Sequence, residues 1–194
     1  MRIIDVSTTI EDGMRLYEGD PEFKLKKIKT VTADGTELSE ISMCAHAGTH
    51  VDAPAHYLKG GQTIDEIELG KLSGTAIVCE VADKAIDAAE LTEHEILEGD
   101  IVLFKTDQNT YLSQSGADYL VAKKIKACGI DSLSIEDPYT KGGKTHKKLL
   151  SKGILIIEGL NLKNVKSGRY SFQCLPLKIK GCEAAPARCI LVED

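Results

Sequence analysis

Three of the five histidines in this 194-residue chain lie in one short segment, residues 46–56, which reads HAGTHVDAPAH. They are His46, His50 and His56, and the carboxylate of Asp52 lies between the last two. Imidazole nitrogens and carboxylate oxygens are ligands that Zn²⁺, Mn²⁺ and Fe²⁺ accept, and three protein ligands leave positions free for water or substrate. A lone histidine is more often a satisfied surface or core side chain, but this cluster favours a metal site.

The neighbouring residues indicate how the segment presents these side chains. Residues 40–46 alternate between two sets of side chains, which predicts a strand that ends at His46. Gly48 lets the backbone turn. His50 and Asp52 are two residues apart, so in an extended segment they point to the same side. A proline two residues after Asp52 disfavours a helix, so this is not the His-Glu-x-x-His arrangement of zinc proteases.

A second pair of candidate ligands lies later in the chain. His146 is near the start of a predicted helix, and Glu158 directly follows the apolar run 154–157, which predicts a buried strand. A helix–turn–strand unit brings its two ends together, and a buried carboxylate needs a partner. These residues therefore predict a site that contains both side chains. The alternative for His146 is an exposed position among lysines.

The pattern His-x-Gly-Thr-His-x-Asp-x-Pro-x-His in residues 46–56 resembles the hallmark of the cyclase-type metal-dependent hydrolases, the family that includes bacterial kynurenine formamidase (arylformamidase). The resemblance implies that His46, His50 and Asp52 bind one divalent metal ion. It implies that Asp52 also bridges to a second ion, and that His56 is the catalytic acid/base.

The same resemblance extends to three residues outside the motif. It implies that His146 and Glu158 hold the second metal ion together with the bridging aspartate. Residues 17–21, YEGDP, resemble the family's aromatic-Pro-Gly-Asp element, whose aromatic residue lines the substrate pocket. Tyr17 stands where a tryptophan is expected, so the pocket stays aromatic while the substrate can differ. An ordinary loop residue is the alternative for Tyr17.

The expected chemistry is hydrolysis of an amide or formamide C–N bond in a small-molecule substrate. Two divalent ions roughly 3.5–4 Å apart can hold a hydroxide and polarise a carbonyl. Zn²⁺ is the expected metal, two ions per subunit, with Mn²⁺ possible. The resemblance makes N-formylkynurenine the leading substrate, with another cyclic amide or a lactone as the alternative. Two further readings stay open, namely a single-metal site and a metal-binding module without turnover.

Composition bounds the partners and the location of the protein. The net charge of −6 argues against nucleic-acid binding, and no apolar run is long enough to span a membrane. The N-terminus has no signal-peptide core, and the six cysteines show no Cys-x-x-Cys spacing, so we expect a reducing cytoplasm. The resemblance implies a homodimer or a larger homo-oligomer.

Hydrophobic patterning predicts a single α/β domain over residues 1–194 with a mixed sheet, because strands and helices alternate in the second half after a strand-rich first half. The resemblance implies a swivelling β/β/α domain. A short helical piece is expected within 87–97, and helices are expected at 115–128 before a stop at Gly129 and at 145–152. Strands are expected at 2–6, 23–31, 37–46, 74–81, 101–106, 130–135, 154–157, 170–180 and 188–192.

Overall fold

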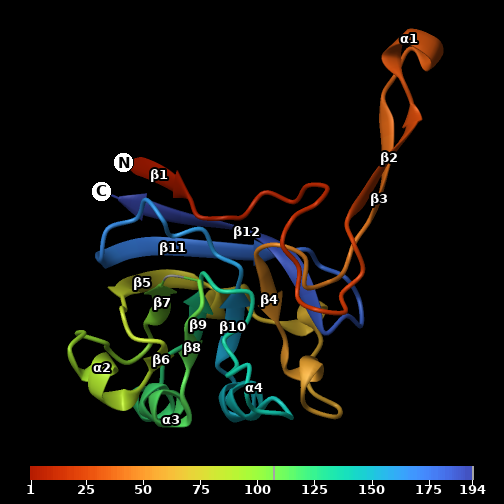
Figure 1. Cartoon of the computed structure of the whole chain (residues 1–194). Helices are drawn as coiled ribbons and strands as arrows, with labels where there is room; N and C mark the ends of the chain where they lie inside the picture. Colours follow the sequence, from red (N-terminus) through yellow and green to blue (C-terminus); the bar gives the residue numbers. More distant parts are fainter. Residues whose placement is uncertain (107, 194) are drawn as a thin grey trace.

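The computed structural model describes residues 1–106 and 108–193. Its centre is an eight-stranded sheet in the order β1-β12-β11-β5-β7-β9-β10-β4, and β4 also pairs with β12, which closes the sheet into a barrel-like ring (Figure 1). The strands of this sheet are β1 (Arg2–Asp5), β4 (His50–Asp52), β5 (Ser73–Glu80), β7 (Ile101–Lys105), β9 (Ala127–Ile130), β10 (Leu155–Glu158), β11 (Gly168–Pro176) and β12 (Ala184–Glu193).

The sheet is mixed, as the sequence predicts. Strands β5, β7, β9 and β10 run parallel to their neighbours in this series, and β1, β4, β11 and β12 are joined by antiparallel pairings. The parallel strands are apolar and buried on both faces, which is the usual state of parallel strands in α/β proteins. The result is a single α/β domain.

Two apolar cores lie on opposite faces of the parallel strands. One core includes Val51, Leu103 and Phe172 and fills the inside of the closed sheet. The other includes Phe104 and Leu120 and lies between the sheet and the helices α2 (Ala88–Thr92), α3 (Gln114–Lys123) and α4 (Lys144–Leu150). The helices therefore cover the outer face of the ring, below the sheet in Figure 1.

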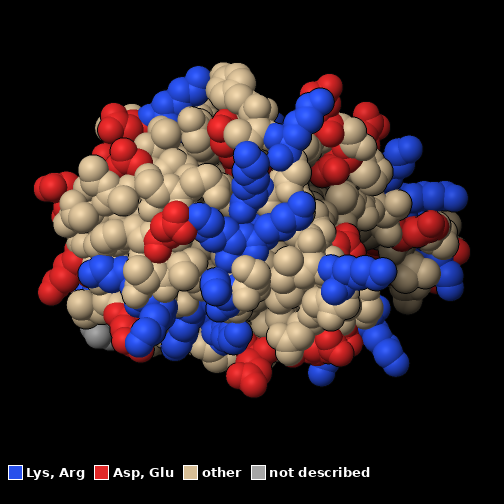
Figure 2. Space-filling model, turned by 90° about the horizontal axis from the view of Figure 1, so that it is seen from below, with Lys and Arg blue, Asp and Glu red and all other residues tan. Residues whose placement is uncertain are grey.

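Short elements complete the connections. They are the 3₁₀ turns η1 (Pro54–His56), η2 (Ile64–Glu66) and η3 (Leu69–Lys71), and the small parallel pair β6 (Ala85–Ile86) and β8 (Tyr111–Leu112). From below, lysine and arginine side chains form a band across the middle of the molecule, with acidic side chains interspersed and at the rim (Figure 2). Among the described residues, no helix is long and apolar enough to cross a membrane.

A hairpin arm of β2 (Lys24–Lys29) and β3 (Leu38–Ser42) projects from the body, with the short helix α1 (Val31–Asp34) at its tip (Figure 1). The prediction that the second of these strands continues to His46 is wrong. Among the described residues β3 pairs only with β2, and it ends at Ser42, opposite Lys24, where the chain re-enters the body and turns. The alternation in residues 40–46 does not mark a core face, because Ile41 is 57% exposed.

Two further predictions near the second candidate pair are wrong. The helix α3 ends at Lys123, and Lys124 rather than Gly129 adopts the left-handed conformation that ends it. Gly129 instead lies inside β9, where an added Cβ would come within 2.7 Å of Leu160. The predicted strand 130–135 is an irregular connection after β9. Gly129 therefore allows the sheet to pack closely against Leu160. From its spacing in the sequence alone, a glycine with this role looks the same as a glycine that ends a helix.

A glycine locks the end of β10 to the histidine motif. Gly159 has a φ of +66°, and its carbonyl accepts hydrogen bonds from Thr8 Oγ1 at 2.7 Å and from Thr49 Oγ1 at 2.6 Å. An added Cβ would lie 2.4 Å from the carbonyl oxygen of Gly48. The close approach of these two backbones therefore requires glycine.

We expect Gly159→Ala to lower the free energy of unfolding by about 3 kcal/mol or more, since left-handed strain adds to a backbone clash. Gly181→Ala is the matched control, because Gly181 also has a positive φ, of +76°, but has no atom within 4 Å of the added Cβ. It should lose about 1 kcal/mol. Urea unfolding of the two variants measures the difference. Equal decreases in the free energy of unfolding would show that the close approach of Gly159 to Gly48 does not require glycine.

Candidate metal centre

Two neighbouring strands position three of the predicted ligands. In the antiparallel pair β4–β10, His50 lies opposite Glu158, and Asp52 lies opposite Ile156. His50 Nδ1 is 2.9 Å from the Gly48 carbonyl oxygen, to which it can donate, so Nε2 faces the carboxylates. His50 Nε2 lies 3.6 Å from Asp52 Oδ1 and 3.4 Å from Glu158 Oε2. The extended geometry predicted for His50 and Asp52 is confirmed.

The fourth side chain comes from α4. His146 is buried, and its Nε2 lies 3.1 Å from Glu158 Oε1 and 3.4 Å from Asp52 Oδ2. The prediction that the helix–turn–strand unit brings His146 and Glu158 together is confirmed. Two imidazoles and two carboxylates therefore converge on one buried point, where both histidine Nε2 atoms face both acids.

His46 reaches the same cluster from the turn after the arm. Its Nδ1 lies 3.0 Å from Asp52 Oδ1, and its Nε2 lies 3.5 Å from Glu183 Oε1. The ring of His56, on η1, is 4.4 Å from the ring of His46 between centroids and 5.7 Å from that of His146. All five predicted metal ligands and the predicted acid/base are thus assembled in one place.

Within the described residues, the donor atoms close enough to hold an ion form two groups. One group is His46, Asp52 and His56, and the other is His50, Asp52 and Glu158. Asp52 belongs to both groups, as a bridging carboxylate must. The grouping differs in detail from the one that the resemblance implies, because here His56 is within reach of His46 and Asp52, and His50 is within reach of Glu158.

The electrostatics of the cluster keep both acids charged. Burial alone would raise the pKa of Asp52, but the neighbouring His146 and His46 hold it well below its usual range. Burial likewise opposes ionisation of Glu158, yet His146 and His50 lower its pKa to about 2. Burial disfavours charged imidazoles, but the two acids raise the pKa of His50 to about 9 and that of His146 further. Without metal, two protonated imidazoles balance two carboxylates.

The donor set fits a divalent cation. His50 Nε2 and both carboxylate oxygens of Asp52 are buried and make no hydrogen bond with any residue of the described ranges. Leaving such atoms unsatisfied costs free energy, and leaving a buried carboxylate without compensation costs more. Nitrogen and carboxylate oxygen donors of this kind are the set that Zn²⁺ and Mn²⁺ accept. The orphaned atoms therefore face the position that an ion would occupy.

One contributing residue was not identified from the sequence. Glu136 Oε2 is 2.8 Å from His146 Nδ1 and accepts the backbone N–H of His146 at 3.1 Å, and both carboxylate oxygens accept the N–H of Thr145. The acid thus caps α4 and turns His146 Nε2 toward the cluster. The same segment also holds Asp131 and Asp137, and Asp131 accepts hydrogen bonds from the N–H and the hydroxyl of Thr106. No sequence signal separates Glu136 from these neighbours.

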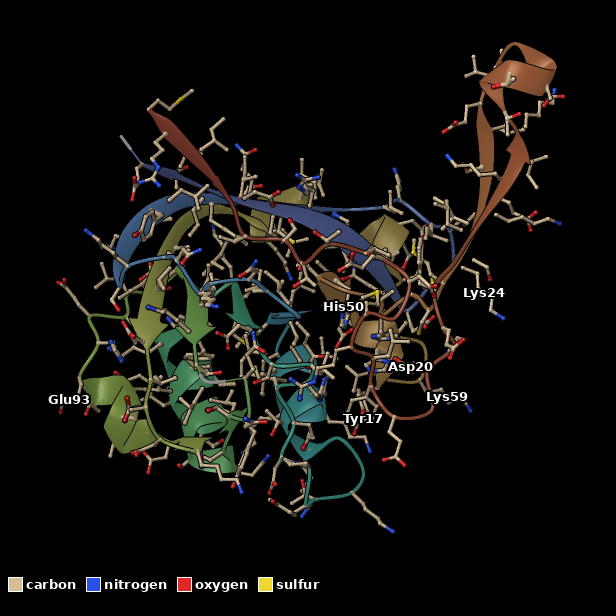
Figure 3. All side chains as sticks on the ribbon, turned by 45° about the horizontal axis from the view of Figure 1, so that its top comes forward. Tyr17, Asp20, Lys24, His50, Lys59 and Glu93 are labelled. Carbon is tan, nitrogen blue, oxygen red and sulfur yellow. The ribbon has the colours of Figure 1, made fainter. Side chains whose placement is uncertain are left out.

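A cavity of about 430 Å³ opens beside the cluster. His46, His50, His56, His146 and Glu158 line it, together with Tyr17 and Tyr57. Tyr17 is 55% exposed and lies on the loop before β2, below His50 in the view of Figure 3, with Asp20 on the same loop. The predicted pocket position of Tyr17 agrees with this geometry. The volume is in the range of small-molecule sites.

Comparison with known proteins identifies the family. The profile of a family described as putative cyclase matches residues 4–137, which is more than half of the chain and includes the whole 46–56 motif. The chain belongs to the cyclase family. Cyclase-like protein 2 of Oryza sativa subsp. japonica is 33% identical to it over 99% of this chain and 79% of its own length. Kynurenine formamidase of Erythrobacter litoralis is 31% identical over 99% of this chain and 94% of its own length.

Two solved structures share the architecture. A predicted metal-dependent hydrolase from Bacillus stearothermophilus has a TM-score of 0.86 and 37% identity, covering 98% of this chain and 97% of its own. Isatin hydrolase A from Labrenzia aggregata has a TM-score of 0.88 at 20% identity, covering 98% of this chain and 93% of its own, which shows a common fold. The closed mixed sheet is therefore a shared scaffold.

Metal binding at pH 7 should release protons. His50 and His146 are protonated in the metal-free protein, because their pKa values lie above 7, whereas a ligating imidazole must be neutral. Affinity should therefore fall as the pH drops below about 9, the pKa of His50. Calorimetry in buffers with different ionisation enthalpies counts the protons. A binding heat that is independent of the buffer would contradict this assignment.

Glu136→Leu should weaken metal binding by about 10–100-fold, since loss of such an outer carboxylate typically has this effect. Glu136→Gln should do less, because the amide oxygen still accepts the His146 Nδ1–H. Glu66→Gln is the control, since Glu66 accepts the Thr63 N–H at the start of η2 and belongs to neither donor group. Equilibrium dialysis with Zn²⁺ measures the affinities. Equal affinity in all variants would remove Glu136 from the site.

Proposed function

We propose that the protein is a metal-dependent hydrolase of arylformamides, with N-formylkynurenine as the leading substrate. The observation that carries the proposal is the buried Asp52, shared by two groups of donors, beside a cavity that His56 also lines. Relatives named kynurenine formamidase cover nearly the whole chain, and the chain is accordingly an enzyme, an amide hydrolase. That its substrate is an aryl formamide is the step we propose beyond this general activity.

His46, His50 and Asp52 would hold one divalent ion, and His146 and Glu158 would hold a second one together with Asp52. Zn²⁺ suits this set best, and Mn²⁺ is the second candidate. When bound, divalent ions polarise a substrate carbonyl and lower the pKa of bound water to about 7. The protein contributes the fixed carboxylates, which remain anionic at neutral pH, and the imidazoles that face them.

His56 would move the proton. Burial lowers the pKa of His56 from its ordinary value, and the nearby His46 and His146 act in the same direction, although the carboxylates oppose it. Its ring is therefore neutral at pH 7 and can accept a proton from the attacking water at a ring nitrogen. The same nitrogen then donates the proton to the leaving amine, which completes the cleavage of the C–N bond.

Aromatic side chains would bind the aryl group. Tyr17 lines one side of the cavity, and Tyr57 packs against His146 with ring centroids 4.8 Å apart. An aryl formamide can place its ring against such walls while its small formyl group reaches the cluster. A cyclic amide or a lactone presents the same carbonyl and is the second candidate substrate. A binding module without turnover is disfavoured by the open cavity and by His56.

We also propose the setting of the protein. The resemblance implies a swivelling β/β/α domain and a homo-oligomer of two or more chains, hydrophobic patterning favours one domain over residues 1–194, and the cysteine spacing favours a cytoplasmic location. The projecting arm supports association, because Leu25 and Ile41 form an exposed cross-strand apolar pair on an isolated hairpin. Two-stranded hairpins are marginally stable alone, so a partner surface would stabilise the arm.

The assay that tests the function measures kynurenine release from N-formylkynurenine, alongside isatin and a simple lactone. Activity should disappear with a chelator and return with Zn²⁺ or Mn²⁺, and Tyr17→Ala should mainly raise KM. No turnover of the formamide by freshly remetallated protein would overturn the substrate assignment. Turnover of isatin or the lactone instead would establish the second candidate.

His56→Gln should keep the metal and lose turnover by about 10²–10⁴-fold, as expected when the only acid/base is removed. His94→Gln is the matched control, because His94 lies between Glu93 and Glu95 and does not line the cavity. Metal content by elemental analysis and kcat are measured on the same samples. Loss of metal in His56→Gln would make His56 a ligand, which its place in one donor group allows, and would refute the proton-transfer role.

A further inference from the structure

Two of the six cysteines lie directly opposite each other on neighbouring strands of the closed sheet. Strands β11 and β12 lie side by side (Figure 1), and in their antiparallel register Cys174 is paired with Cys189. Both side chains are completely buried in the core inside the sheet. Both cysteines are free thiols in the structure. The register therefore brings two thiol groups together in one part of the core.

The backbone hydrogen bonds show which kind of strand pair the two cysteines form. The Cys174 N–H donates to the Leu72 carbonyl at 3.0 Å. On the other strand, the Cys189 N–H donates to Ser7 Oγ at 2.8 Å, and its carbonyl accepts from the Val6 N–H at 3.0 Å. The polar backbone groups of the two cysteines thus point away from each other. This is the non-hydrogen-bonded type of antiparallel pair, in which opposite side chains are closest.

The spacing of such a pair fits a disulfide. Opposite Cα atoms in a non-hydrogen-bonded pair are about 4.5 Å apart, and disulfides join Cα atoms that are roughly 4.4–6.8 Å apart. A bond between Cys174 and Cys189 can therefore form without moving either strand. Because the strands already hold the two thiols together, closing this bond costs little further chain entropy in the folded protein.

Access to the pair depends on the end of the β11–β12 hairpin. Burial and the neighbouring Cys189 thiol raise the pKa of Cys174 well above its ordinary value, so the closed hairpin keeps this thiol unreactive. The pairing of β11 with β5 stops at Gln173, and beyond it β11 pairs with β12 alone among the described residues. Just past the pair, Leu175 and Leu177 are about half exposed. Such an end opens locally more easily than the core of a sheet, and opening exposes the thiols.

The buried cysteines of the parallel strands lack this arrangement. In the register of the sheet, Cys79 lies opposite Phe104. Cys128 lies opposite Val102 on one side and Ile156 on the other. Each of these thiols thus has apolar partners where the β11–β12 pair has a second sulfur. They provide matched controls of equal burial.

We propose that Cys174 and Cys189 are a site of reversible disulfide formation, whose oxidant is a low-molecular-weight disulfide such as oxidised glutathione. One thiolate of the pair attacks a sulfur of the small disulfide, and one small thiolate leaves. The other cysteine then attacks the protein sulfur of this mixed disulfide and displaces the second small thiolate. Two electrons pass from the pair to the small disulfide, and the two cysteine protons end on the two small thiols.

The bond would fasten β12 beside the strand that closes the ring. Residues Ala184–Pro186 of β12 pair with β4, and the Ala187 N–H donates to the Thr49 carbonyl at 2.8 Å. A covalent link at Cys189 would hold this part of β12 to β11. We therefore expect the oxidised protein to be more stable than the reduced protein. The inference does not depend on the proposed hydrolase function.

The test equilibrates the Zn²⁺-loaded protein with glutathione buffers that range from fully reduced to fully oxidised. Remaining thiols are alkylated in denaturant, and linked peptides are mapped by mass spectrometry. The oxidised buffer should yield one linked pair that contains Cys174 and Cys189, and reduction should restore both thiols. Oxidation confined to the partly exposed Cys44 and Cys182, or a 174–189 link that forms only in denaturing urea, would overturn the proposal.

Variants connect the bond to its expected effect on stability. Oxidation should raise the thermal midpoint of the wild type by about 5–15 °C, the range expected for one added disulfide in a domain of this size. Cys174→Ala should show no such rise, whereas Cys128→Ala should keep both the link and the rise. An equal rise in Cys174→Ala, or a lower midpoint in the linked wild type, would overturn the proposal. If either variant fails to fold, the peptide map and midpoint of the wild type decide.

Discussion

The charge of Asp52 is the constraint on which the rest of the site depends. Its side chain is completely buried, and neither of its carboxylate oxygens makes a hydrogen bond with a described residue. An isolated buried carboxylate is too costly to persist, so positive charge must surround it. His46 and His146 hold its pKa low in the metal-free protein, and a divalent ion can replace their protons. The turn before β4, β4 itself and α4 each bring one imidazole to this acid, from His46, His50 and His146.

The supporting contacts show how the fold meets that requirement. Strand β10 brings Glu158 alongside β4, and Glu136 at the start of α4 turns His146 toward both acids. The carbonyl of Gly159 holds Thr49 of the motif, which fixes the turn before His50. The contacts of β10 with β4 and of Gly159 with Thr49 join segments more than one hundred residues apart in sequence. The site is therefore a product of the closed sheet and not of the motif segment alone.

Sequence patterns were sufficient where a residue's role is local. The spacing of His50 and Asp52 predicts their common side in a strand, and the apolar run before Glu158 predicts a buried strand, as observed. Predictions from these patterns failed where tertiary packing decides the role of a residue. Glycine at position 129 serves strand packing, the alternation before His46 belongs to an exposed arm, and Glu136 acts only because α4 folds onto it. Closure of the sheet by β4 follows from long-range pairing, which local periodicity does not encode.

The closure of the ring has a consequence for how the protein comes apart. Strand β4 has only three residues, and it is the seam at which β10 and β12 meet. Val51 points into the core while His50 and Asp52 point to the metal side, so a slip of one residue would reverse all three. A divalent ion bound by side chains of β4, β10 and α4 would link the strands that meet at this seam. Removal of that ion would weaken the closure of the barrel at its shortest strand, so the proposed site and the closed sheet would be lost together.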